Sequence, residues 1–155
     1  MCGVVGFVGQ TKYPEICLKE MVNAINHRGP DNTGIWVDSN IGLGHARLSI
    51  IDLSSAGHQP MHSVSSNFVM IFNGEIYNHN EIRMELNSLH ERKWTGHSDT
   101  ETLLEAIEQW GLETTLNKTK GMFSIALWDK RNRNLYLSRD RTVSYTHLTL
   151  PTRYR

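Results

Sequence analysis

The second residue of the chain is a cysteine, and this position gives it a chemical property that an internal cysteine lacks. If Met1 is removed, the α-amine of Cys2 becomes free beside its own thiol. An α-amine titrates near ~7.7–8.0 and a thiol near ~8.5, so around neutral pH part of the amine is unprotonated and can accept the thiol proton. With Met1 retained, the nitrogen is an amide and cannot act as a base. Cys2 is therefore a candidate nucleophile, and the alternative is a small packing residue.

The elements that would position Cys2 can be predicted from the pattern of apolar residues. A glycine-bounded apolar run at 3–9 predicts a buried strand directly after the cysteine. Apolar residues at helical spacing from Pro14 onward predict a helix that stops at 27–30, where glycine and proline follow. Residues that favour strands, separated by turn-forming clusters, predict the next three strands, at 35–37, 41–51 and 68–72.

The second half of the chain is predicted to contain helices and then a hairpin. A short apolar stripe at 82–89 predicts one helix, and the capping-box spacing of Ser98 and Glu101 predicts the start of another that runs to Trp110. Strand-forming residues at 122–128 and 135–137 flank a polar, basic segment, a pattern typical of a β-hairpin. Strands are thus expected at both ends of the chain, with helices between them.

Composition narrows the classes of function. The 155 residues fit one domain. Lys plus Arg number 16 and Asp plus Glu number 16, without long blocks of one sign, so neither nucleic acid nor an anionic membrane is an expected partner. Two cysteines, Cys2 and Cys17, are too few for a disulfide framework, and no targeting or membrane-spanning segment is apparent. We therefore expect a cytoplasmic protein with a small-molecule partner.

Several short motifs follow one another along the chain in a fixed order. They are MCGVVG at 1–6, HRGPD at 27–31, GLGHARLSIID at 42–52, GHQPM at 57–61, NGEIYN at 73–78, SDTE at 98–101, GMF at 121–123 with ALWD at 126–129, and SRDR at 138–141. This ordered set resembles the N-terminal glutaminase domain of asparagine synthetases, one branch of the class II glutamine amidotransferases. Any one motif is a modest signal, whereas the ordered set is highly specific.

The resemblance implies a fold and a reaction. The expected fold class is α+β, an N-terminal-nucleophile hydrolase αββα sandwich of two mainly antiparallel sheets between helical layers, with the nucleophile at the start of the first strand. In the reaction that the resemblance implies, Cys2 attacks the side-chain amide of glutamine, ammonia leaves, and water releases glutamate from the thioester.

The resemblance also assigns residues to the binding of free glutamine. Arg47 would bind the α-carboxylate, where a planar guanidinium can bond bidentately, and Glu75 and Asp99 would surround the α-ammonium. Leu48 and Ile50 would add backbone or wall contacts. Simpler interpretations remain for four of them. Arg47 could be a solvated strand arginine, and Asp99 is also an ordinary first-turn acid of a capped helix. Leu48 and Ile50 fit plain strand packing.

The pair Asn73 and Gly74 resembles the oxyanion hole of the family. A side-chain amide and an unobstructed backbone N–H would converge there on the developing negative oxygen. The alternative is an Asn-Gly hairpin turn that ends the strand at 68–72. The segment 27–31 resembles the loop that closes over the site, and it is equally well formed as a helix stop.

No metal site or cofactor is expected in this chain. His58 and His62 have a spacing that could bind zinc on a helix, but Pro60 between them argues against a helix there. ATP and Mg²⁺ would serve only the synthetase domain that normally follows in the same chain. That domain and glutamine are the expected partners, and a homodimer of the longer protein is left open.

The resemblance ends after Arg141. We therefore expect a glutamine amidotransferase type 2 domain over 1–141, incomplete at its C-terminal end, and an unassigned tail over 142–155 that does not match the family. The parent activity would be glutamine-dependent conversion of aspartate to asparagine. The alternatives are an inactive fragment or binding module, and a glutaminase domain that serves a different acceptor.

Overall fold

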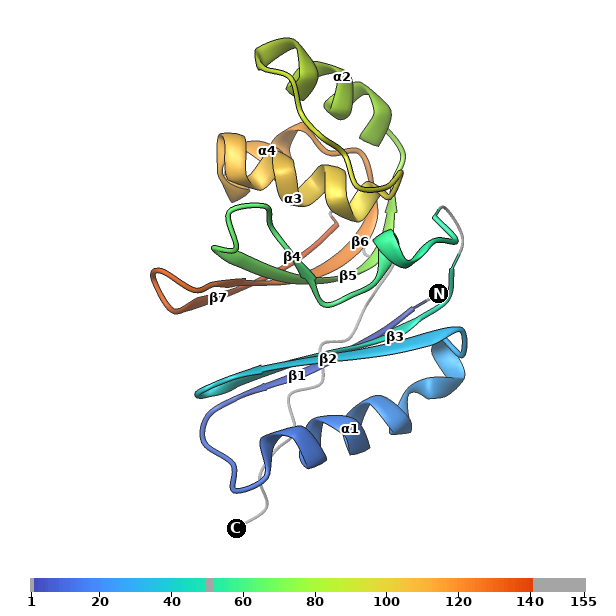
Figure 1. The fold of residues 1–155 in the computed structure, drawn as a ribbon, viewed down its shortest axis with the longest axis vertical. Coiled ribbons are helices and arrows are strands. Elements are labelled where there is room, and N and C mark those ends of the chain that lie inside the picture. The colour runs from blue at the N-terminus through green and yellow to red at the C-terminus, as the bar shows by residue number, and fades with distance from the viewer. Residues whose placement is uncertain (1, 50–51, 141–155) are drawn as a thin grey trace.

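The computed structural model describes residues 2–49 and 52–140, and these fold into layers in the order helix, sheet, sheet, helices (Figure 1). In Figure 1, helix α1 (Pro14–Ala24) lies beneath one sheet, and helices α2, α3 and α4 lie above the other. Every strand pair among the described residues is antiparallel. The predicted αββα sandwich is therefore confirmed.

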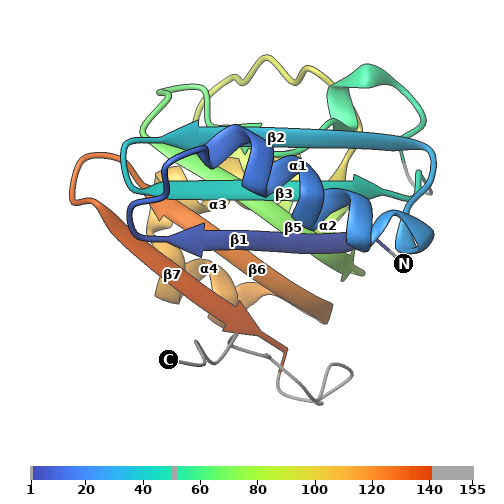
Figure 2. The ribbon, with the colours of Figure 1, turned by 90° about the horizontal axis from the view of Figure 1, so that it is seen from below.

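The first sheet has the strand order β1-β3-β2, with β1 at Gly3–Val8, β2 at Asn32–Asp38 and β3 at Ile41–Arg47. Figure 2 shows β3 between its two neighbours and α1 lying across their outer face. Helix α1 buries Leu18 and Val22 against this sheet. A Cβ on Gly44 would lie 2.5 Å from Val22 Cγ2, so the glycine lets the helix approach β3 closely. A short 3-10 turn, Asn26–Arg28, then leads the chain into β2.

The second sheet and its helices contain the rest of the described chain. The sheet has the order β4-β5-β6-β7. Its strands are β4 (Met61–His62), β5 (Phe68–Ile76), β6 (Gly121–Asp129) and β7 (Asn134–Arg139), and its helices are α2 (His79–Leu89), α3 (Asp99–Trp110) and α4 (Leu112–Lys118). A second 3-10 turn, Ser55–Gly57, lies between the two sheets in the chain order.

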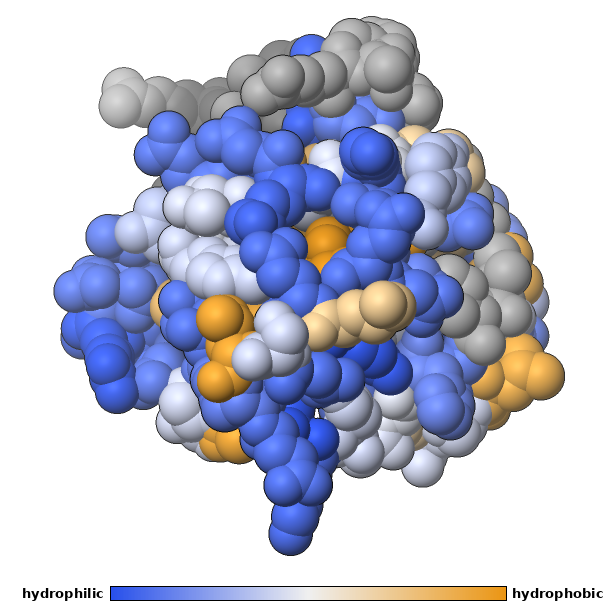
Figure 3. Space-filling view, turned by 90° about the horizontal axis from the view of Figure 1, so that it is seen from above, coloured by the Kyte–Doolittle hydropathy of each residue, from blue (hydrophilic) through white to orange (hydrophobic). Residues whose placement is uncertain are grey.

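Two apolar cores hold the layers together. The larger one lies between the second sheet and the helices and includes Met70, Leu104 and Leu127. The smaller one lies between the two sheets and includes Leu43, Ile71 and Trp128. Seen from above the helical layer, the surface is mainly hydrophilic with separate apolar spots (Figure 3), as expected for helices whose apolar faces point inward.

Some boundaries differ from the prediction. Strand β3 ends at Arg47 rather than at residue 51, and residues 50–51 lie outside the described chain. Strand β5 continues through Asn73 and Gly74, which pair with Ser124 and Phe123 of β6, so the hairpin-turn interpretation of this pair is wrong. The short elements β4 and α4 were not predicted, because two and seven residues give too little periodic signal.

The predicted tail at 142–155 lies outside the described residues. In the described part of the chain, no helix has the length and apolar character that a membrane crossing requires.

Candidate active site

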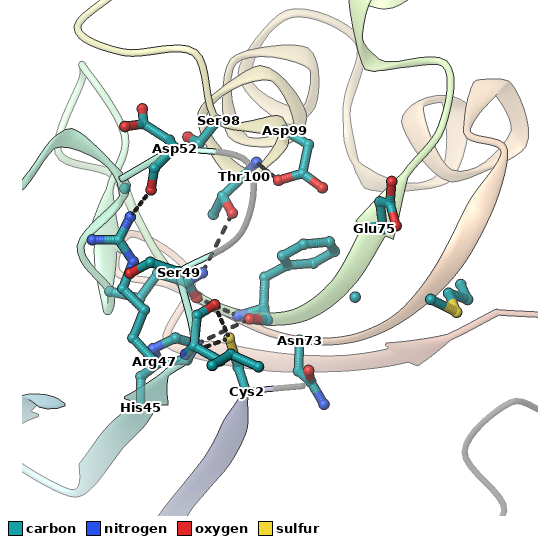
Figure 4. Close-up of a pocket in the computed structure, with 16 residues that line it drawn as sticks. Cys2, His45, Arg47, Ser49, Asp52, Asn73, Glu75, Ser98, Asp99 and Thr100 are labelled. Carbon is teal, nitrogen blue, oxygen red and sulfur yellow. Dashed lines mark hydrogen bonds between the residues drawn. The ribbon is translucent and has the colours of Figure 1, made fainter. Parts of the chain in front are cut away.

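A cavity of about 100 Å³ lies where the N-terminal end of β1 meets the second sheet and the start of α3. Figure 4 shows Cys2 and Asn73 near its base, Arg47 on one side, and Asp99 and Glu75 on the opposite side. These residues come from both sheets and from a helix, and they are brought together only by the packing of the layers.

The sulfur of Cys2 is held by the segment that follows β3. The backbone N–H of Leu48 donates to Sγ at 3.3 Å, and the thiol can donate to the Leu48 carbonyl oxygen at 3.5 Å. Arg28 Nε donates to the carbonyl oxygen of Cys2 at 3.2 Å. A Cβ on Gly29 would overlap the backbone of β3 at Ala46, which explains why the loop before β2 needs a glycine at this point. Cys2 is thus held by Leu48, directly after β3, and by Arg28 of the 27–31 loop.

The guanidinium of Arg47 is buried and faces the loop that follows β3. Nη1 donates to the carbonyl oxygen of Ser54 at 2.9 Å, and Nη2 donates to that of Asp52. A guanidinium carries five N–H donors, so these two bonds orient the group and leave donors for a ligand. A Cβ on Gly57 would overlap Arg47 Nη2, so any larger residue there would force the guanidinium to shift.

Asp52 organises that loop. Its carboxylate accepts hydrogen bonds from Ser54 Oγ at 2.6 Å, from Ser54 N at 2.8 Å and from His97 N at 3.0 Å. The Ser54 hydroxyl is the main cause that lowers the pKa of Asp52 to about 2, with the His97 N–H next. The carboxylate therefore stays ionised at neutral pH and ties the Arg47 loop to the segment before α3.

The edge of β5 that faces the cavity is bonded mainly by side chains. Phe72 N donates to Gln59 Oε1 at 2.6 Å, the Phe72 carbonyl oxygen is 3.2 Å from His45 Nε2, and Ile76 N donates to Asp99 Oδ2 at 3.0 Å. Backbone groups of alternate residues in an antiparallel strand point to the same edge. Gly74 lies between Phe72 and Ile76 in this alternation, so its N–H points to the same edge, toward the cavity that Gly74 lines.

The close pairing of β5 with β6 also requires a glycine at position 74. A Cβ there would overlap the carbonyl oxygen of Met122 and approach Phe123 Cα to 2.6 Å. The absence of a side chain at Gly74 therefore lets β5 and β6 pair closely at this point.

Asp99 and Glu75 supply the carboxylates of the site. Asp99 is 5% exposed, and its Oδ1 accepts from Thr100 N at 2.9 Å. Burial raises the pKa of Asp99, and the hydrogen bond from Ile76 opposes that rise. Ser98 caps α3, since its hydroxyl accepts from Glu101 N at 3.1 Å, so Asp99 serves as a first-turn acid as well as lining the cavity. Glu75 is exposed at the end of β5.

His45 is buried behind Arg47 on β3, with 1% of its surface exposed. Burial lowers the pKa of His45 to about 4, and the Phe72 carbonyl only partly offsets this. The imidazole is therefore neutral at pH 7. Its Nε2 is the ring atom near the Phe72 carbonyl, and Nδ1 has no hydrogen-bond partner among the residues that the structure describes.

The structure brings the predicted site residues together, with one outside its described range. Those lining the cavity are Cys2, Arg47, Leu48, Asn73, Gly74, Glu75 and Asp99. Ile50 lies outside the described residues. Several other residues line the cavity without having been predicted as site residues, namely His45, Ser49, Asp52, Gly57, Gln59, Phe72, Ser98, Thr100 and Met122. All of them fall inside or directly beside the motifs, which was the signal available for finding them.

No group of three or more His, Cys, Asp or Glu side chains in residues 2–49 and 52–140 is arranged to hold a metal ion.

Two antiparallel sheets between helices, with a cysteine directly before the first strand and beside a cavity of mixed charge, form the N-terminal-nucleophile hydrolase fold. Residues 1–144 match the family model of the glutamine amidotransferase domain, and the chain belongs to this family. It is accordingly an enzyme domain of the glutamine amidotransferase type.

Similar proteins support this assignment. The chain is 40% identical over 147 residues to asparagine synthetase [glutamine-hydrolyzing] 1 of Bacillus subtilis. The aligned region covers 90% of this chain and 22% of that protein. The chain is 35% identical over 155 residues to the amidase chry2 of Gibberella zeae. That aligned region covers 91% of this chain and 23% of the amidase. The chain therefore spans between a fifth and a quarter of the length of these relatives. The asparagine synthetase relatives confirm the resemblance found in the sequence.

One solved structure supports the fold. The glutamine phosphoribosylpyrophosphate amidotransferase of B. subtilis, in complex with ADP and GMP, superposes with a TM-score of 0.68 at 18% sequence identity. The match covers 84% of this chain and 35% of that one.

Proposed function

We propose that this domain hydrolyses glutamine to glutamate and ammonia, with Cys2 as the nucleophile after removal of Met1. The observation that carries the proposal is that one cavity joins the Cys2 sulfur to a guanidinium on one side and to carboxylates on the other. Free glutamine carries a carboxylate and an ammonium at a fixed separation from its amide, so this arrangement matches its charges.

In the proposed mechanism, the free α-amine of Cys2 takes the thiol proton and the sulfur attacks the side-chain carbonyl carbon of glutamine. The side-chain amide of Asn73 and the N–H of Gly74 stabilise the oxyanion. The intermediate collapses with loss of ammonia, which takes up the proton held by the α-amine, and leaves a thioester. Water, deprotonated by the same amine, then attacks the thioester carbon and releases glutamate and the free thiol.

Substrate binding follows from the positions of the charged side chains. Arg47 uses its remaining donors on the α-carboxylate, while Asp99 and Glu75 bind the α-ammonium. Leu48 lines the cavity beside Cys2 and supplies wall contacts, and Ile50 is assigned the same role from the sequence. The hydrolytic step requires no cofactor.

The similarity to asparagine synthetases supports a further assignment for the longer protein. There the ammonia would be transferred to an activated aspartate in a synthetase domain that uses ATP and Mg²⁺, with asparagine as the product. The similarity to the Gibberella zeae amidase supports a second candidate, a glutaminase domain that serves a different acceptor. The chain over 1–141 would supply the glutaminase part in both cases.

The proposal can be tested with an electrophilic glutamine analogue. The purified chain and its Cys2→Ala and Cys17→Ala variants are incubated with the analogue, and the intact mass and the labelled peptide are read. We expect a single adduct on Cys2 in a chain that lacks Met1, blocked by excess glutamine and unaffected by Cys17→Ala. Glutamate release by Cys2→Ala would contradict the proposal, as would a chain that lacks Met1 but remains unlabelled.

A further inference from the structure

The side chain of Gln59 replaces a missing strand at the edge of β5. Strand β4 pairs with β5 only at Val69 and Met70, so the edge beyond Met70 lacks a strand partner within the described chain. At that point Gln59 Oε1 accepts the hydrogen bond from Phe72 N at 2.6 Å. Gln59 is 5% exposed, so water cannot readily replace this bond.

The other end of the same carboxamide reaches helix α3. Gln59 Nε2 donates to Thr100 Oγ1 at 3.3 Å, and Thr100 N donates in turn to Asp99 Oδ1 at 2.9 Å. One side chain therefore joins the residue before Asn73 to the residue after Asp99. Asn73 belongs to the proposed oxyanion hole, and Asp99 belongs to the proposed ammonium site.

The backbone of Gln59 is fixed from the first sheet. A Cβ on Gly34 in β2 would overlap the carbonyl oxygen of Gln59 and lie 2.8 Å from His58 Nε2. Gly34 pairs with His45 in β3, and His45 contacts the Phe72 carbonyl. The backbone of Gln59 thus lies against one sheet while its side chain bonds to the other sheet and to α3.

We propose that Gln59 is a positioning residue, which fixes the distance between the oxyanion-hole strand at Asn73-Gly74 and the ammonium-binding carboxylate of Asp99. This inference rests on the proposed glutaminase function and adds a residue that couples chemistry to recognition of the α-ammonium. A primary amide is suited to the task because it accepts at one atom and donates at the other. Glutamate retains only the acceptor, and methionine retains neither.

The test compares two substrates in the 155-residue chain. Glutaramate is glutamine without its α-ammonium, so the ratio of kcat/KM for glutamine to that for glutaramate measures use of the Asp99 site. Rates are normalised to the reactive Cys2 content. Losing the Gln59 tie should lower this ratio about ten-fold, the factor expected for one hydrogen bond, and should lower kcat for both substrates. A variant that merely folds less well would lose both activities equally and keep the ratio.

The variants are Gln59→Met and Gln59→Glu, with Gln10→Met at an exposed position as the matched control. Gln59→Glu keeps the acceptor for Phe72 N–H, so its kcat for glutaramate should stay nearer to that of the parent than the kcat of Gln59→Met. Gly34→Ala should displace the backbone of Gln59 while leaving its side-chain amide intact. It should therefore also lower the ratio of kcat/KM for glutamine to that for glutaramate. It keeps the proposal testable if Gln59→Met fails to fold.

Amide hydrogen exchange gives a second measurement that is independent of turnover. Exchange of the Phe72 N–H should be at least ten-fold faster in Gln59→Met and unchanged in Gln10→Met. If the parent chain turns over glutamine while Gln59→Met keeps both the ratio and the exchange rate, the role of Gln59 is overturned alone. If the parent chain does not hydrolyse glutamine, the proposed function and the role of Gln59 are both overturned.

Discussion

Oδ2 of Asp99, at the first residue of α3, accepts a hydrogen bond from the backbone N–H of Ile76, at the last residue of β5, over 3.0 Å. This contact fixes a buried carboxylate against the strand that carries the proposed oxyanion hole. The edge of β5 and the start of α3 are therefore joined directly at the proposed site.

Asp99→Asn should raise KM for glutamine by about ten- to one-hundred-fold while changing kcat less, because a charge-assisted contact to the ammonium is lost and the oxyanion hole is retained. Both oxygens of Asp99 accept backbone hydrogen bonds, from Ile76 N and Thr100 N, and an amide retains only one acceptor. The unfolding midpoint should therefore fall, although burial disfavours the charged carboxylate and raises the pKa of Asp99. Steady-state kinetics and thermal unfolding check both expectations. Glu20→Gln on the exposed surface of α1 is the control, and equal KM values in the two variants would remove Asp99 from the ammonium site.

Gly57→Ala should raise KM for glutamine by about ten-fold or more, because the added methyl group overlaps Arg47 Nη2 and turns the guanidinium away from the α-carboxylate. The effect should be much weaker for a glutamine derivative whose carboxylate is amidated. Ser55→Ala, in the same 3-10 turn but exposed, is the neighbouring control. Unchanged KM in a folded Gly57→Ala chain would show that Arg47 does not bind the carboxylate.

Asn73→Ala should lower kcat by about 10²- to 10³-fold, the usual loss for one oxyanion-hole donor, and change KM by only a few-fold. The residue pairs with Ser124 inside β5, so alanine keeps the strand and the register. Stopped-flow or single-turnover assays locate the loss in thioester formation. Asn80→Ala, exposed on α2, serves as the matched change, and a purely KM-based effect of Asn73→Ala would argue against an oxyanion role.

The stability of the domain should carry a pH dependence from His45. Burial lowers the pKa of His45 to about 4 in the folded state, whereas an unfolded histidine titrates near ~6.5. Between these two pH values the unfolded state therefore binds more protons than the folded state. The contribution of His45 to the free energy of unfolding is fully present above about pH 6.5. It is lost as the pH falls toward about 4, by on the order of 3 kcal/mol. Other groups titrate in this range, so the difference between parent and variant is the quantity to measure.

Urea unfolding at several pH values provides that difference. His45→Gln keeps an N–H donor for the Phe72 carbonyl but cannot titrate, so the free energy of unfolding should fall less steeply below pH 6.5 than in the parent. His90→Gln, at an exposed position after α2, should keep the parental slope. Identical slopes in the His45→Gln and parent chains would show that His45 is not held neutral.

The sequence by itself determined much of the secondary structure and the identity of the main site residues. The strand after Cys2, the helix from Pro14, the capped helix from Asp99 and the hairpin of β6 and β7 follow from local periodicity, capping and turn chemistry. The order of the motifs indicated the family, because many weak signals in one order are jointly specific. Periodicity, capping, turn chemistry and motif order depend only on the order of residues along the chain, so they can be recognised without knowledge of the fold.

Only the tertiary structure decided how backbone groups on different elements are satisfied. In isolation Asn73 and Gly74 suggest a turn, but pairing with β6 makes them part of a strand, and the short β4 leaves an edge that side chains must complete. Gln59 fills that role through bonds to Phe72 and Thr100, which are far from it in sequence. The physical reason is that a buried N–H or carbonyl needs a partner from whichever residue the packing brings near, and sequence spacing does not encode that choice.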